Sequence, residues 1–153
     1  MIRKLFVQVI ESISVSDSSA VVDRDAALRL ATAVLMIDVA RADHVFDESE
    51  FERVLRLVEQ HFQLSPEEAA DLVILASDTA DDLVSVHEFT ELLHEHLDEN
   101  EKARIVGMLW DVAYADGQLD KYEDSLVLKI SDLLYVSRPR VMRLKHDAKH
   151  RQS

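Results

Sequence analysis

Apolar side chains recur every three or four residues along most of this chain, the spacing that places them on one face of an α-helix. Residues 2–13 follow that period, and "SVSDSSAVV" (14–22) then has the small, polar composition of a flexible link. From Asp23 to about Ala42 the chain is apolar on nearly every side, which predicts a buried central helix. We therefore expect an N-terminal amphipathic helix and linker over 1–22, followed by a helical domain over 23–150.

Helix-start signals divide the rest of this domain. "SPEE" (65–68) offers an N-cap, a proline in the first turn and two acids at the positive end of the helix dipole. "SVHE" (85–88) has the spacing of a capping box. Further helices are expected at about 47–62, from 65 onward, and at 85–97, 100–115, 120–134 and from 137 onward. With only 2 Gly and 2 Pro, the sequence predicts an all-α fold of seven to eight helices.

The second half of the domain repeats the first. "LMIDVARADHVFDESEFERVL" (35–55) aligns without a gap over "MLWDVAYADGQLDKYEDSLVL" (108–128), and "LSPEEAADL" (64–72) then aligns with "VSRPRVMRL" (136–144) after the loss of one residue. The acids that recur are Asp38 and Asp111, Asp43 and Asp116, Asp47 and Asp120, and Glu50 and Glu123. This pattern predicts two pseudo-symmetric helical-hairpin repeats, at about 24–80 and 97–148, because neither hairpin can bury its apolar face alone.

Charge and cysteine content exclude several functions. The formal net charge is −13, whereas nucleic acid and anionic lipid both favour clustered Lys and Arg, so neither is an expected partner. Without any Cys there are no disulfides, thiolate metal sites or thiol catalysis. The sequence shows no signal peptide and no apolar run near the ~20 residues that span a bilayer. We expect a cytoplasmic protein with no direct membrane insertion.

Half of the recurring acids have a purely structural explanation. Asp47 with Glu50, and Asp120 with Glu123, fit an N-cap followed three residues later by the Glu of a capping box. Such a cap stabilises a helix by about 1 kcal/mol and needs no ligand.

The other two pairs of acids are not explained by capping. Asp43 and Asp116 fall in the last turn of a helix, where the dipole disfavours a carboxylate. Asp38 and Asp111 lie in apolar runs such as "GMLWDVAYA", where a buried carboxylate without a partner would take up a proton or destabilise the fold. We expect a cation or a cross-helix hydrogen bond beside them, unless these faces are exposed.

An EF-hand does not fit the second copy. With Asp116 and Glu123 at the fifth and twelfth loop positions, Val112 and Tyr114 stand where the first two acidic ligands belong. What remains is a turn between two helices that carries three acids, with a fourth about one helical turn upstream. Oxygen ligands of this kind suit a hard cation such as calcium or magnesium.

These two stretches, "LWDVAYADGQLDKYEDSLVLKISDLLYVS" and "LMIDVARADHVFDESEFERVLRLVEQHFQLS", resemble the TerB-like family, named for a bacterial tellurite-resistance protein. They are also similar to the N-terminal domain of a membrane-anchored DnaJ-type co-chaperone, although no DnaJ signature or anchor accompanies them. The resemblance covers roughly 24–148 and implies an all-helical fold in two pseudo-symmetric halves. It also implies divalent-cation binding by the acids of the two turns, which are Asp38, Asp43, Asp47, Glu50, Asp111, Asp116, Asp120 and Glu123.

Two functions of different classes are therefore open. The first is a non-catalytic divalent-cation-binding or adaptor module in a bacterial stress system of the tellurite-resistance kind, in which calcium or magnesium biases how the hairpins pack. The second is a structural protein–protein interaction domain whose acids only cap helices. Both imply a protein partner, and a homo-oligomer is also open. No Gly-rich phosphate loop, H-E-x-x-H or G-x-S-x-G motif is present, so we do not expect an enzyme.

Two smaller features complete the sequence. "HEH" (94–96) points its two imidazoles about 200° apart in a helix, so they cannot chelate one ion, and a solvated helix end is expected. "RPRVMRLKHDAKHR" (138–151) carries six Lys and Arg against one Asp. These cations either complement the helix dipole and acidic neighbours, or form a docking arm for an acidic partner or for head-to-tail self-association.

Overall fold

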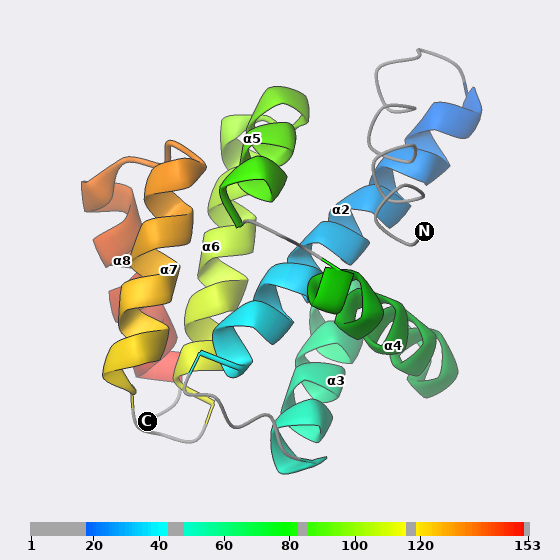
Figure 1. Ribbon diagram of the computed structural model, residues 1–153, viewed down its shortest axis with the longest axis horizontal. Coiled ribbons are helices and arrows are strands. Elements are labelled where there is room, and N and C mark those ends of the chain that lie inside the picture. Colours follow the sequence, from blue (N-terminus) through cyan, green and yellow to red (C-terminus); the bar gives the residue numbers. More distant parts are fainter. Residues whose placement is uncertain (1–17, 43–47, 83–85, 116–118, 152–153) are drawn as a thin grey trace.

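The computed structural model describes residues 18–42, 48–82, 86–115 and 119–151, which form seven α-helices and no strand (Figure 1). The helices are α2 (Ser18–Ala40), α3 (Glu48–Phe62), α4 (Pro66–Asp82), α5 (Val86–His96), α6 (Glu99–Ala113), α7 (Lys121–Leu133) and α8 (Arg138–Arg151). The predicted all-α fold is confirmed. The helix expected over 2–13 lies outside the described residues.

The helices α2 and α6 pack against each other in the middle of the molecule, with α3 and α4 on one side and α7 and α8 on the other (Figure 1). Equivalent helices make equivalent contacts, since α2 packs on α3 and α4 as α6 packs on α7 and α8. The helix α5 links the two halves and packs on α7. The C-terminal ends of α2 and α6 and the N-terminal ends of α3 and α7 lie toward the same end of the molecule.

The two central helices supply most of the core. Nearly every side chain of α2 from Leu30 to Ala40 is buried, as its all-round apolar pattern predicted. In α6, Leu109 and Trp110 are fully buried. The outer helix α3 buries one stripe instead, which includes Val54 and Val58. Burying a large apolar side chain contributes about 1.5–3 kcal/mol, so the packing of α2 against α6 contributes strongly to the stability of the domain.

The second helix of each half ends in the same way. Gln63 after α3 and Tyr135 after α7 have φ angles of 54° and 61°, a left-handed conformation that costs a residue other than glycine about 1–2 kcal/mol. In each case the next amide donates to a carbonyl five residues earlier, at 3.2 and 3.1 Å, which is the geometry of a Schellman motif. Gln63 and Tyr135 are also equivalent in the alignment of the two copies.

The start of α2 differs from the sequence expectation, and the start of α6, expected at about residue 100, carries a capping box that was not predicted. The helix α2 begins at Ser18, so 18–22 are helical instead of part of a link, because extending an existing helix gains one hydrogen bond per residue ordered. The helix α6 begins at Glu99 with a capping box, in which Glu101 N donates to Asp98 Oδ1 at 2.8 Å and Asp98 N donates to Glu101 Oε1 at 3.0 Å.

The N-cap expected at "SPEE" is confirmed, and Glu68 completes it as a capping box. Glu68 N donates to Ser65 Oγ and Ser65 N donates to Glu68 Oε1, both at 3.1 Å. These bonds hold the pKa of Glu68 below its usual range, because they favour the ionised carboxylate. Ser85, expected to cap the next helix, lies outside the described residues.

Candidate functional site

Both acid turns line one pocket, with a volume of about 500 Å³. The first copy contributes Glu50 from the first turn of α3, and the second contributes Asp120 and Glu123 from the start of α7. The apolar part of the lining is made by Ala40, Val54, Leu57, Val112, Ala115 and Leu119. The pocket lies there because the ends of α2, α3, α6 and α7 converge at this end of the molecule (Figure 1).

The charged groups of the pocket leave it slightly acidic. The lining carries three carboxylates and two cations, so its formal charge is −1. The carboxylates are Glu50, Asp120 and Glu123, and the cations are Arg53 and Lys121. The ammonium of Lys121 lies 5.1 Å from the centroid of the exposed Tyr122 ring, a cation–π contact at the edge of the site. The pocket lining therefore combines apolar and charged side chains, with carboxylates from both copies of the motif.

Asp120 acts as the N-cap of α7, as the sequence predicted. Its Oδ2 accepts from Tyr122 N at 2.9 Å and from Glu123 N at 3.3 Å, which satisfies two amides that lack a partner within the helix. One carboxylate of the pocket is thus already bound to the backbone.

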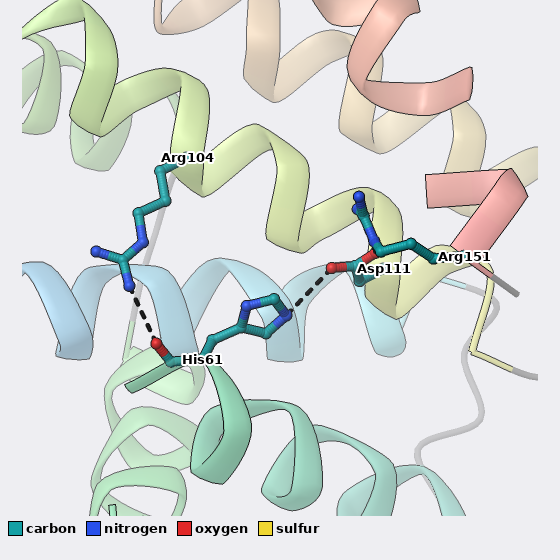
Figure 2. A network of polar contacts seen from close by, with 4 residues as sticks. All are labelled: His61, Arg104, Asp111 and Arg151. Atoms are coloured by element: carbon teal, nitrogen blue, oxygen red, sulfur yellow. Dashed lines mark hydrogen bonds and ion pairs between the residues drawn. The ribbon is translucent and has the colours of Figure 1, made fainter. Parts of the chain in front are cut away.

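Asp111 is buried on α6, and side chains from two other helices compensate its charge (Figure 2). Arg151, at the end of α8, donates to Oδ1 from Nε at 3.1 Å and from Nη2 at 2.7 Å. His61, near the end of α3, places Nε2 3.1 Å from Oδ2. The expectation of a cation or a cross-helix hydrogen bond beside this carboxylate is confirmed, and Asp111 needs no metal ion to offset its charge.

Arg104 extends this network to the C-terminal end of α3 (Figure 2). Its Nη2 donates to the carbonyl oxygen of His61 at 3.0 Å, and its guanidinium lies 5.6 Å from the Phe62 ring centroid. Arginine at this place satisfies a carbonyl that has no partner within the helix. Polar contacts therefore join α3, α6 and α8. The sequence indicated only that Asp111 needs a partner, and did not identify His61, Arg104 or Arg151.

Asp38, the equivalent of Asp111 in the first copy, has a different environment. It is half-buried, and desolvation raises its pKa, an effect that the charge of Arg41 partly offsets. The two copies therefore compensate equivalent acids differently, because Asp111 has an arginine and a histidine in contact with its oxygens.

The family model described as "Tellurite resistance protein TerB" matches residues 29–146, from within α2 to within α8. The chain belongs to the TerB family. No curated protein and no solved structure matches the chain significantly. The match spans both acid turns, so the resemblance carried by the doubled motif is confirmed over residues 29–146.

The metal site expected for a TerB-family protein falls only partly within the described residues. Asp43, Asp47 and Asp116 lie outside them. The described acids of the motif are Asp38, Glu50, Asp111, Asp120 and Glu123. Within the described ranges, no group of three or more His, Asp or Glu side chains is close enough to hold a metal ion. Since Asp111 and Asp120 also have protein partners, the described donors do not by themselves fit a divalent cation.

Cations of the basic helix α8 in this TerB-family domain form ion pairs with acids of neighbouring helices. Arg138 Nη2 lies 2.9 Å from Asp132 Oδ2, and Lys145 Nζ lies 2.8 Å from Asp124 Oδ1, both ion pairs between α8 and α7. With Arg151 on Asp111, these contacts favour the interpretation in which the cations of α8 complement acidic neighbours. Across the described helices, none is long and apolar enough to cross a membrane.

His94 is not simply solvated, contrary to the expectation for "HEH". Its Nδ1 lies 2.8 Å from Nζ of the buried Lys102, and its ring centroid is 4.4 Å from that of Tyr135. Because an ammonium only donates, Nδ1 accepts, and the proton of the neutral imidazole is on Nε2. Lys102 also lies 2.8 Å from Glu99 Oε1, which lowers the pKa of Glu99. This cluster joins α5 to α6 and to the turn before α8.

Proposed function

We propose that this TerB-family domain is a non-catalytic adaptor that binds a basic segment of a protein partner, with one Lys or Arg side chain of that segment in the pocket between the acid turns. The observation that carries the proposal is that Glu50 and Glu123, at equivalent positions of the two copies, line one pocket whose lining also includes apolar side chains. Lys and Arg combine an aliphatic stem with a charged end, so they match both parts of this lining.

The charge of the chain supports a basic partner. A formal net charge of −13 attracts cationic segments over a distance and speeds their association at low salt. An interaction domain whose acids only cap helices is the alternative, and it accounts for Asp120. It also gives Glu50 and Glu123 the place of the glutamate in a capping box, but it gives no role to the pocket that both of them line. On the basis of family membership, we propose a cytoplasmic, tellurite-resistance-like stress system as the setting.

The test compares two probes that differ in charge and hardly in shape. N-acetyl-L-arginine methylamide carries the guanidinium, and N-acetyl-L-citrulline methylamide replaces it with a neutral urea. We expect the arginine probe to bind with a Kd of about millimolar, near −4 kcal/mol, and the citrulline probe to bind at least about tenfold more weakly. Titration followed by NMR measures both.

Paired variants distinguish binding in the pocket from general electrostatic attraction to the acidic chain. The double variant Glu50→Gln/Glu123→Gln removes both carboxylates from the lining and should abolish the difference between the probes. Glu52→Gln/Glu59→Gln removes the same charge from α3 outside the lining and should preserve that difference. Equal binding of the two probes, or an equal loss in both double variants, would overturn the proposal.

A second candidate is a divalent-cation site at the acid turns, to which Glu50, Asp120 and Glu123 of the pocket lining would contribute only part of the ligands. Calcium or magnesium would require further oxygen ligands, because these ions take six or more. Isothermal titration with each ion tests the idea, with Glu123→Gln and Glu52→Gln as a matched pair. Binding tighter than about millimolar that Glu123→Gln alone weakens supports the cation. No binding below about millimolar excludes it.

A further inference from the structure

Far from the acid turns in the sequence, the helix α8 carries two imidazoles side by side. His146 and His150 are four residues apart, their side chains are exposed, and their ring centroids lie 4.2 Å apart at an interplanar angle of 64°. Residues four apart in a helix project from one face, with Cβ atoms about 5–6 Å apart. We propose that His146 and His150 form a binding site for a late first-row transition ion of the class of Cu²⁺, Ni²⁺ and Zn²⁺.

The chemistry of the two side chains selects this class of ion. Neutral imidazole nitrogen suits copper, nickel and zinc, whereas calcium and magnesium require oxygen ligands. Zinc binds histidine nitrogen at about 2.0–2.1 Å, and exposed rings that already touch can turn their nitrogens toward a common ion by side-chain rotation. The protein supplies two ligands, and water completes the coordination.

The position of this site near the end of α8 has one favourable and one unfavourable electrostatic effect on the binding of a cation. His150 lies in the last turn of α8, where the negative end of the helix dipole stabilises a cation. Lys149 and Arg151 in the same turn oppose a second positive charge. Both are exposed, so the high dielectric of water weakens this repulsion, and Arg151 is directed to Asp111.

The other histidines with described side chains lack this arrangement. His94 and His96 are two residues apart and project about 200° from each other, and Nδ1 of His94 is bonded to Lys102. His61 has no second histidine beside it on α3. Among the histidines with described side chains, His146 and His150 are therefore the pair whose spacing allows them to chelate one ion.

An ion at this site also acts on the rest of the fold. It joins the last two turns of α8, the helix whose terminal Arg151 reaches Asp111 on α6. A ligand that binds only the folded state raises the melting temperature. Loading the site therefore stabilises the domain against heat.

The experiment uses the full, untagged chain, stripped with EDTA and dialysed. Titration with Cu²⁺, Ni²⁺, Zn²⁺ and Mn²⁺ should show one ion per chain, tightest for Cu²⁺ and weakest for Mn²⁺. His146→Gln and His150→Gln should each weaken Ni²⁺ and Zn²⁺ by about tenfold or more, a change of about 1.4 kcal/mol per tenfold. Copper electron paramagnetic resonance should show hyperfine coupling to two nitrogens in the wild type.

Control variants make each outcome decisive. His96→Gln removes one histidine elsewhere and should leave the affinity and the metal-induced rise in melting temperature unchanged. Both α8 variants replace exposed side chains, so their melting temperatures without metal should match that of the wild type. Affinity that persists in His146→Gln or His150→Gln, or that falls equally in His96→Gln, overturns the site. The arginine probe reports the pocket separately, since these variants should not change its binding.

Discussion

Replacing Arg151 by glutamine should destabilise the domain far more than its place at the end of α8 suggests. The substitution keeps a polar but shorter side chain and removes the charge that faces the buried carboxylate of Asp111. His61 remains beside the other oxygen, so the carboxylate keeps one partner.

The magnitude follows from the burial of the two partners. Removing one member of a buried ion pair costs about 3–5 kcal/mol. The Arg151 side chain is 51% exposed against 5% for Asp111, so solvent screens part of the interaction, and we expect a loss of about 1–2 kcal/mol. In a chain of this length that lowers the melting temperature by roughly 2–8 °C.

A double-mutant cycle measured by urea denaturation tests the reasoning. Arg151→Gln should cost much less in an Asp111→Asn background, giving a coupling energy of about 1–2 kcal/mol. Arg143→Gln is the matched control, since it removes an exposed cation from the same helix and should change stability by less than about 0.5 kcal/mol. A coupling energy below about 0.3 kcal/mol would refute the ion-pair account of Asp111.

Three further predictions concern stability and use chemical denaturation. Asp120→Ala should lose about 1 kcal/mol with or without chelator, because it removes the cap of α7; a loss that appears only with metal present would contradict the capping role. Gln63→Gly should gain about 0.5–1 kcal/mol by relieving a left-handed φ, whereas Gln60→Gly inside α3 should lose about as much, and the same sign for both would contradict the argument. Burial raises the pKa of Asp38. The contribution of this side chain to folding stability is therefore greatest below the ordinary pKa of 3.8 and is lost as pH rises through the raised pKa. Asp38→Asn should therefore increase stability at about pH 7 relative to about pH 3, and an equal effect at both would contradict the direction of the shift.

Periodicity predicted the helices well because it reports which face of a segment is apolar. The pattern from Asp23 onward was apolar on nearly every side, and the helix it predicted is the buried α2. It predicted less well where helices begin. The capping box at Asp98 was not predicted, although its spacing is the same as that of the boxes recognised elsewhere. The helix over 18–22 was not predicted because the composition of this segment is also found in loops.

The partners of Asp111 could not be predicted in the same way. The sequence showed that a carboxylate in "GMLWDVAYA" needs compensation, because burial without a partner is unfavourable at any position. Which cation supplies it depends on how helices pack, and Arg151 is 40 residues away along the chain. For the same reason the repeat identified Glu50 and Glu123 as equivalent, but only the packing of four helix ends brings them to one pocket.

The central claim, that the pocket between the two acid turns is the binding site, is tested most directly by an amide chemical-shift map. The ¹⁵N-labelled full chain is titrated with N-acetyl-L-arginine methylamide and, separately, with its citrulline analogue. We predict that the arginine probe shifts the amides of pocket residues most, including Glu50, Arg53, Ala115, Leu119 and Glu123, and that the citrulline probe shifts them little. The largest shifts on α4 or α8, or the same map with both probes, would contradict the account.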